Sequence, residues 1–110
     1  MVSDTLTEAD TAPWKSTTRI VRRGDAANVV AGLKAGDGGD ILTFGSRTTW
    51  NGLAAAGLVD ELHLMVGAKV VGAGTPLFGE ALAGTSLRLL DVERREGSSN
   101  VVLRYALDAR

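Results

Sequence analysis

Residues 39–78 read GDILTFGSRTTWNGLAAAGLVDELHLMVGAKVVGAGTPLF, and this stretch decides the fold. A turn-forming Gly-Asp pair leads into the apolar run ILTF at residues 41–44, which has the length of a strand and no polar alternation. Such a run is typical of a strand buried on both faces, as in a parallel sheet. Residues 41–44 are therefore predicted to form a buried strand.

A helix is predicted directly after this strand. Ser46 can cap its N-terminus, and Trp50 and Leu53 then share one face and point inward. Gly57 ends the helix, and Leu58 is placed for the hydrophobic contact of a Schellman motif. Strand, glycine turn and helix together predict a βα unit.

A second buried strand is predicted over residues 61–71, which are mostly apolar and bend at Gly67. Strand, helix and strand would form a βαβ unit, which is right-handed and parallel in nearly every known case. The glycine-rich residues 72–76 must then form a loop.

The flanking segments complete the predicted domain. Residues 1–6 have the pattern of a strand end. A helix is predicted from an N-cap at Asp25 to about Ala35, with Val29, Val30 and Leu33 on its inward apolar face. Residues 87–96 and 101–107 are strand-like and are joined by the four-residue loop 97–100, which indicates an antiparallel hairpin. We expect one α/β domain over residues 1–110.

Composition excludes several classes of function. With a formal net charge of −1 and a pI near 5.7, the chain has no strong positive electrostatic field that would attract nucleic acid or anionic membranes. Without Cys the chain has no disulfide, no thiolate nucleophile and no Cys-ligated zinc, and one His adds no metal site. No apolar run reaches the roughly 20 residues that span a bilayer, and the start lacks a signal peptide, so we expect a cytoplasmic protein.

The turn formed by Gly45, Ser46, Arg47 and Thr48 carries the clearest chemical signal. A strand that ends in glycine at the start of a helix presents backbone N–H groups and a positive dipole end to an anion. The hydroxyls of Ser46 and Thr48 can donate further hydrogen bonds, and the guanidinium of Arg47 adds positive charge. A pyrophosphate would therefore fit at this turn. The alternative is that Gly45 is only a tight turn and Ser46 only a helix cap.

The wider pattern supports the first interpretation. Its features are the Gly-Asp-Ile start of the first strand at 39–41, Gly45-Ser46, Leu53, GLVDEL at 57–62, VGAG at 71–74, Leu77-Phe78, the hairpin that ends at Tyr105, and SDTL at 3–6. In order and spacing these features resemble the C-terminal signature of the reductase domain of riboflavin biosynthesis and its dihydrofolate-reductase-like relatives.

The resemblance implies a three-layer α/β/α sandwich, with a mixed sheet and a C-terminal antiparallel hairpin, that lacks the N-terminal strands of the family. It further implies NADPH laid across the C-terminal ends of parallel strands. Gly45, Ser46, Arg47 and Thr48 would hold the pyrophosphate. Ser3 and Thr5 would lie near the adenosine end. Many relatives have a second glycine where this chain has Ser46.

In the family, a central strand and the substrate-contacting residues precede the position that matches Met1, so this chain looks N-terminally truncated. Unpaired strand edges would then be exposed, and we expect a homodimer that covers them. The implied function is an NADPH-dependent reductase of the riboflavin-pathway (5-amino-6-(5-phosphoribosylamino)uracil reductase) or dihydrofolate-reductase-like type, acting on a pterin- or pyrimidine-like substrate. The alternative is a non-catalytic dimerising remnant of the fold. No catalytic residue is identified.

Two other groups of residues are candidates for a role in the site. The single histidine, His63, lies within a strand pattern and is interpreted as structural because no carboxylate partner can be named. Lys15, Arg19, Arg22 and Arg23 could hold the 2′-phosphate of NADP, or could form an ordinary solvated basic face.

Overall fold

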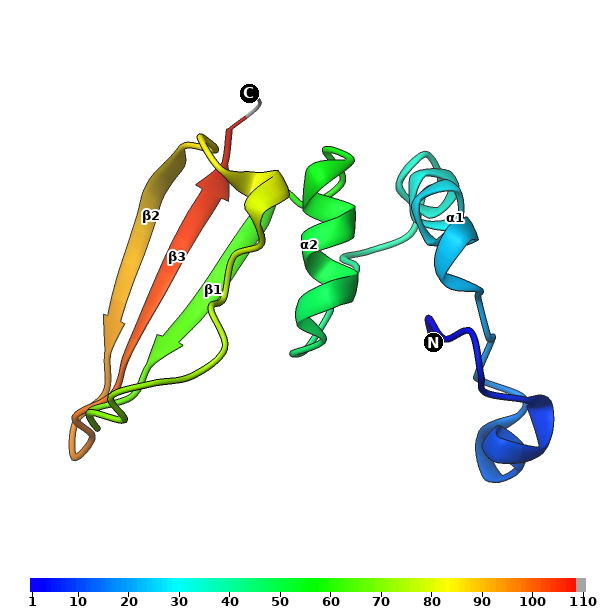
Figure 1. Ribbon diagram of the computed structural model, residues 1–110, viewed down its shortest axis with the longest axis horizontal. Coiled ribbons are helices and arrows are strands. Elements are labelled where there is room, and N and C mark those ends of the chain that lie inside the picture. The colour runs from blue at the N-terminus through cyan, green and yellow to red at the C-terminus, as the bar shows by residue number, and fades with distance from the viewer. Residues whose placement is uncertain (109–110) are drawn as a thin grey trace. The chain divides into compact units, whose positions relative to one another are not determined.

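The computed structural model describes residues 1–108, and Figure 1 shows its elements. These elements are the α-helices α1 (Ala26–Lys34) and α2 (Arg47–Ala55), the strands β1 (Glu61–Val66), β2 (Leu87–Arg94) and β3 (Val101–Leu107), and the 3₁₀ turns η1 (Glu8–Trp14), η2 (Arg23–Asp25) and η3 (Glu80–Leu82). They group into two compact units, Met1–Leu58 and Val59–Arg110. The assignment of residues 1–110 to one domain stays a prediction.

The first unit begins with a short parallel pairing of two segments. Val2 and Val21 form a parallel bridge, in which the N–H of Ser3 donates to the carbonyl of Val21 at 2.9 Å and the N–H of Val21 donates to Met1 at 2.7 Å. Of the strand end predicted at 1–6, only Val2 is paired in this way, and no strand is formed over these residues. Helix α1 follows η2 directly, and Asp25 precedes it without making a side-chain cap hydrogen bond.

Helix α2 ends as its sequence predicts. Gly57 has a φ of +75°, which only glycine adopts without strain. Its N–H donates to the carbonyl of Ala54, and the N–H of Leu58 donates to the carbonyl of Leu53, both at 2.9 Å. These two bonds are the pair that defines a Schellman motif, and they satisfy carbonyls that the end of a helix leaves without partners.

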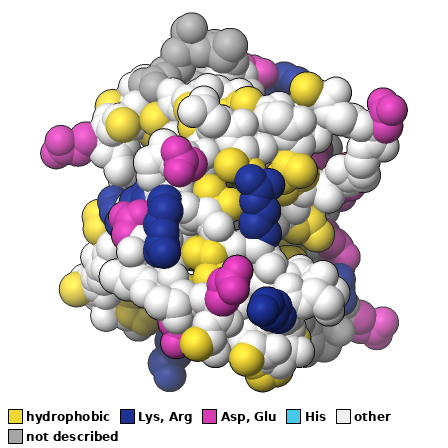
Figure 2. Space-filling view, turned by 90° about the vertical axis from the view of Figure 1, so that its right-hand side faces the viewer, with side chains coloured by type: hydrophobic (Ala, Val, Ile, Leu, Met, Phe, Trp, Pro, Cys, Tyr) yellow, Lys and Arg dark blue, Asp and Glu magenta, His cyan; other side chains and the backbone are white. Residues whose placement is uncertain are grey.

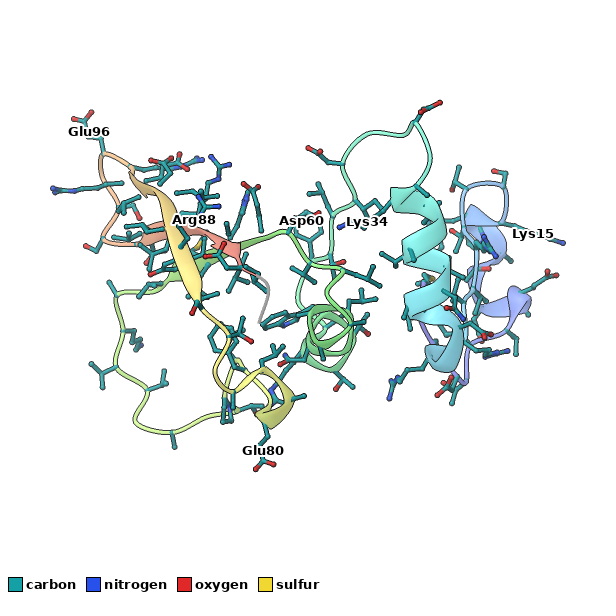
Figure 3. All side chains as sticks on the ribbon, turned by 90° about the horizontal axis from the view of Figure 1, so that it is seen from above. Lys15, Lys34, Asp60, Glu80, Arg88 and Glu96 are labelled. Atoms are coloured by element: carbon teal, nitrogen blue, oxygen red, sulfur yellow. The ribbon has the colours of Figure 1, made fainter. Side chains whose placement is uncertain are left out.

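The second unit is built on a three-stranded antiparallel sheet in the order β1-β3-β2. The hairpin of β2 and β3 is confirmed, although β2 ends at Arg94 and the connecting loop is 95–100 instead of 97–100. Figure 3 labels Glu96 at its tip and Arg88 on β2. The pairing of β2 with β3 shifts register between Leu89 and Asp91, which is a β-bulge. Strand β1 pairs with β3 on the other side, so β1 and β2 are the two edges of the sheet.

Three predictions about strands were wrong. Residues 41–44 form no strand, and Ile41, Leu42 and Phe44 are 48%, 72% and 85% exposed. A strand needs a neighbour that pairs with its N–H and C=O groups, and within residues 1–108 no strand pairs with this segment. The predicted strand at 61–71 ends at Val66.

The third error concerns strand direction. The sequence predicted a parallel βαβ unit in a mixed sheet, but β1 and β2 both pair with β3 in the antiparallel direction. Among the described residues, the only parallel pairing is the bridge between Val2 and Val21. The antiparallel direction places β1 next to the last strand of the hairpin, a long-range pairing that no local pattern encodes.

Few side chains of the described part are buried, although 45% of the residues are apolar. The buried residues are Thr11, Ala26, Trp50, Leu53 and Leu82. Trp50 and Leu53 thus confirm the predicted inner face of α2, whereas Leu33 of α1 was predicted to lie inward and is exposed. Much apolar surface is therefore left in contact with water.

Neither α1 nor any other described helix has the length and apolar character to cross a membrane.

Candidate functional site

The turn before α2 has an unusual backbone. Gly45 has a φ of +61°, and Ser46 has a φ of +56° and a ψ of +58°, so both lie in the left-handed region. Among residues 1–108, Ser46 is the only residue other than glycine with a positive φ. Its carbonyl accepts the N–H of Trp50 at 3.1 Å, which is the first hydrogen bond of the helix.

The Ser46 side chain makes no cap hydrogen bond, so the prediction that it caps α2 was wrong. A capping serine normally has an extended backbone, which aims its hydroxyl at the N–H of the second or third helical residue. In the left-handed conformation the hydroxyl of Ser46 does not make this bond. The amides of the first turn of α2 are therefore not satisfied by the cap residue.

This helix start suits an anion. Gly45, Ser46, Arg47 and Thr48 are all exposed, and no acidic residue lies in the first turn of α2. The N-terminal end of a helix carries about half a positive elementary charge, and Arg47 adds a full one. A Cβ added to Gly45 would meet nothing within 4 Å, so the glycine is required by its positive φ and not by crowding.

Ser3 and Thr5 lie in a separate turn. The Oγ of Ser3 accepts the N–H groups of Thr5 at 3.2 Å and of Leu6 at 3.1 Å, and lies 3.5 Å from the Thr5 hydroxyl. These hydrogen bonds hold the N-terminal turn together, so the Ser3 hydroxyl has a structural role. The described contacts of Ser3 and Thr5 are local or reach the segment at 21–22, and they do not bring these residues to Gly45.

Two of the basic residues near the N-terminus make contacts within the first unit. The guanidinium of Arg22 donates to the carbonyls of Ser3 at 3.1 Å and Leu6 at 3.2 Å, and Lys15, which Figure 3 labels, lies 3.9 Å from the carboxylate of Glu8. Lys15, Arg19 and Arg22 line a hollow of about 400 Å³ together with Glu8 and several threonines. On the face shown in Figure 2, basic and acidic side chains are interspersed.

A cluster on the sheet was missed from the sequence. The imidazole Nε2 of His63 lies 3.3 Å from Glu61 Oε2, and Arg104 Nη2 donates to Glu61 Oε1 at 3.2 Å. Residues 61 and 63 share one face of β1, a relation that the alternation of a strand could have indicated. The hydrogen bond from His63, followed by the charge and hydrogen bond of Arg104, holds the pKa of the Glu61 carboxyl below its usual 4.5.

This cluster has the geometry of a surface ion pair. His63 and Arg104 are cross-strand partners, and all three side chains are partly exposed on the sheet. Exposed pairs of this kind are screened by water and are common in sheets. The premise that His63 has no carboxylate partner was wrong, because Glu61 is one. The structural interpretation of His63 stays a prediction.

Comparison with known proteins identifies the family. The family model described as the RibD C-terminal domain matches residues 2–103 of this chain. The chain belongs to the RibD C-terminal domain family. The match includes the six predicted cofactor residues, namely Ser3, Thr5, Gly45, Ser46, Arg47 and Thr48.

A solved structure supports the same fold. A protein from Shewanella sp. PV-4 that is assigned to riboflavin biosynthesis superposes with a TM-score of 0.75 at 24% sequence identity. The match covers 98% of this chain and 59% of that chain, so this chain spans less than two thirds of the length of its structural relative. Among curated protein sequences, none matches significantly.

Proposed function

We propose that this RibD C-terminal domain is part of an NADPH-dependent reductase and that the start of α2 holds the cofactor's pyrophosphate. The observation that carries the proposal is the uncapped helix start behind two consecutive left-handed residues, Gly45 and Ser46. Helix N-termini of this kind are ready-made anion sites, because their amides point outward and the helix dipole favours negative charge.

The residues present fit an extended dianion. Arg47 and the hydroxyls of Ser46 and Thr48 are exposed beside the first-turn amides of α2, and acidic residues are absent from that turn. Arg47 would pair with a phosphate oxygen, and the hydroxyls would donate to others. When bound, NADPH would supply a hydride, and the task of these residues is to fix its position.

Ser3 and Thr5 are proposed to lie near the adenosine end, and the basic hollow of Lys15, Arg19 and Arg22 is the alternative place for a 2′-phosphate. Arg22 is the least available of these residues because it already holds two carbonyls. Family membership supports a pterin- or pyrimidine-like substrate, in the riboflavin-pathway reductase step, and a cytoplasmic location. A three-layer α/β/α sandwich belongs to the same proposal.

A thermal-shift titration tests cofactor binding. NADPH at about 100 times its dissociation constant should stabilise the fold by about 2.7 kcal/mol. Arg47→Ala should weaken NADPH binding about tenfold or more, because a charge-assisted hydrogen bond contributes about 1.5–3 kcal/mol. The matched control is Arg94→Ala, which removes an exposed arginine from the end of β2 and should leave the affinity unchanged.

If Arg47→Ala and Arg94→Ala lower the affinity for NADPH equally, the affinity depends only on the overall positive charge of the chain. The proposed site would then be rejected. Binding and turnover are separated by following NADPH absorbance with candidate pyrimidine substrates. Binding without oxidation would favour the alternative function, a remnant of the fold that keeps the cofactor cradle but does not catalyse the reaction.

A further inference from the structure

The parallel bridge between Val2 and Val21 brings two segments of the first unit together. The chain runs in the same direction through both residues, so the segments that follow them, residues 3–6 and 22–25, leave the bridge at the same carboxyl end. In open α/β sheets, ligands bind outside the carboxyl ends of parallel strands. Residues 3–6 also include the two residues that are proposed to lie near the adenosine end of the cofactor.

Hydrogen bonds join residues 3–6 and 22–25 into one surface, which we call the carboxyl-end surface. The guanidinium of Arg22 donates to the carbonyls of Ser3 at 3.1 Å and Leu6 at 3.2 Å. The N–H of Arg23 donates to Oδ1 of Asp4 at 2.8 Å. The carboxylate of Asp4 is therefore fixed beside the backbone of Arg23.

The charges of the carboxyl-end surface cancel. It holds two arginines, Arg22 and Arg23, and two aspartates, Asp4 and Asp25, and all four residues are exposed. Arg22 is held by two carbonyls. Asp25 lies at the start of α1, where the helix dipole attracts a negative charge. Asp4 and Arg23 are therefore the two charged residues most available to a ligand.

The two nicotinamide cofactors differ at one group. NADPH carries a 2′-phosphate on its adenosine ribose, whereas NADH has a free 2′-hydroxyl there. In Rossmann-type folds a carboxylate accepts a hydrogen bond from the 2′-hydroxyl of NAD, and a nearby arginine accommodates the 2′-phosphate of NADP. Asp4 offers the first of these groups, and Arg23 offers the second.

We propose that this domain accepts NADH as well as NADPH, and that Asp4 and Arg23 set the selectivity between the two. The inference rests on the proposed function, since it takes the start of α2 as the site of the pyrophosphate that both cofactors share. Asp4 repels a 2′-phosphate and accepts a 2′-hydroxyl, while Arg23 attracts the phosphate. Their opposite charges leave neither cofactor strongly favoured.

Titration calorimetry of the 110-residue chain with NADPH and with NADH tests the proposal. The two dissociation constants of the wild type should agree within about tenfold. Asp4→Asn should tighten NADPH binding about fivefold to tenfold, with little change for NADH, because it removes a negative charge that faces the 2′-phosphate. Asparagine keeps an oxygen that can accept the N–H of Arg23, so the turn is preserved.

Arg23→Gln should act in the opposite direction. It removes a positive charge but keeps the backbone N–H that donates to Asp4, so it should weaken NADPH binding about tenfold and leave NADH binding nearly unchanged. Salt at about 1 M should reduce the effects of both variants, because the screening length then falls to about 3 Å. The matched control is Asp37→Asn, which removes one negative charge from an exposed residue after α1 and should leave the ratio of the two constants unchanged.

Three results would overturn the inference. They are a wild type that binds one cofactor more than about a hundredfold more tightly than the other, variants of Asp4 and Arg23 that change both affinities by the same factor, and an Asp37→Asn variant that changes the ratio as much as Asp4→Asn. The pyrophosphate site is tested separately, because Arg47→Ala should weaken NADPH and NADH equally and leave their ratio unchanged. A chain that binds neither cofactor would reject both proposals.

Discussion

Replacement of Ser46 by glycine should stabilise the protein. Ser46 has a φ of +56° and a ψ of +58°, and this left-handed conformation costs an L-residue about 1–2 kcal/mol. Glycine avoids the strain but gains freedom in the unfolded chain, which offsets about 0.5–1 kcal/mol. The net gain expected for Ser46→Gly is about 0.5–1 kcal/mol, or a rise in Tm of about 2–6 °C.

Ser46→Ala separates backbone strain from helix capping. Loss of a capping serine ordinarily costs about 1 kcal/mol. Because the Ser46 side chain makes no cap hydrogen bond, Ser46→Ala should change stability by less than about 0.5 kcal/mol. The order of stability is therefore expected to be glycine above serine, with alanine close to serine.

Urea unfolding monitored by tryptophan fluorescence measures these differences, since Trp50 is buried on α2 only four residues from the substitution. Equal m-values would show that the substitutions change the free energy of unfolding and not the surface area exposed on unfolding. A loss of about 1 kcal/mol in Ser46→Ala, together with a destabilised Ser46→Gly, would refute the left-handed, uncapped helix start.

The remaining predictions concern the end of α2 and the cluster on β1. Gly57→Ala should cost about 1–2 kcal/mol because its φ is +75°, whereas Gly52→Ala within α2, where an added Cβ meets nothing within 4 Å, should gain about 0.5–1 kcal/mol; urea unfolding compares the two. The lowered pKa of Glu61 means that its contribution to stability is present above its usual 4.5 and is lost as the pH falls through the folded-state value. Thermal melts between about pH 6 and pH 3 should therefore show a smaller acid-induced loss for Glu61→Gln than for the wild type, and identical slopes would contradict the ion pair.

The local parts of the fold could be predicted from the sequence. The end of α2 at Gly57 and the hairpin of β2 and β3 depend on glycine conformations and on contacts between residues close in the chain. Trp50 and Leu53 follow from the helical period. In each case the signal and the structure it specifies lie within a few residues of each other.

The errors share a physical cause, which is that strand pairing is not local. The apolar run at 41–44 has the composition of a buried strand, but a strand forms only where a neighbour supplies hydrogen bonds, and the described residues supply none there. The direction of β1 was wrong for the same reason, since its partner β3 is about forty residues away.

The position of residues 45–48 at the start of a helix was predicted from the sequence, but their backbone conformation was not. Residues 45–48 were expected to present a helix start to an anion, and they do lie at the start of α2. A left-handed serine could not be predicted, because serine disfavours that region and is usually a cap. The same resemblance that placed Ser3 and Thr5 near the cofactor gave no sign that the Ser3 hydroxyl supports a turn.

The most direct test of the cofactor site is to follow the backbone amides by nuclear magnetic resonance while NADPH is added. Amides at residues 45–49, at the start of α2, should shift first and most, and those of the β2–β3 hairpin should stay in place. The shifts should weaken in Arg47→Ala. An unchanged spectrum at millimolar NADPH, or shifts confined to residues outside the first unit, would contradict the proposal that this helix start holds the cofactor.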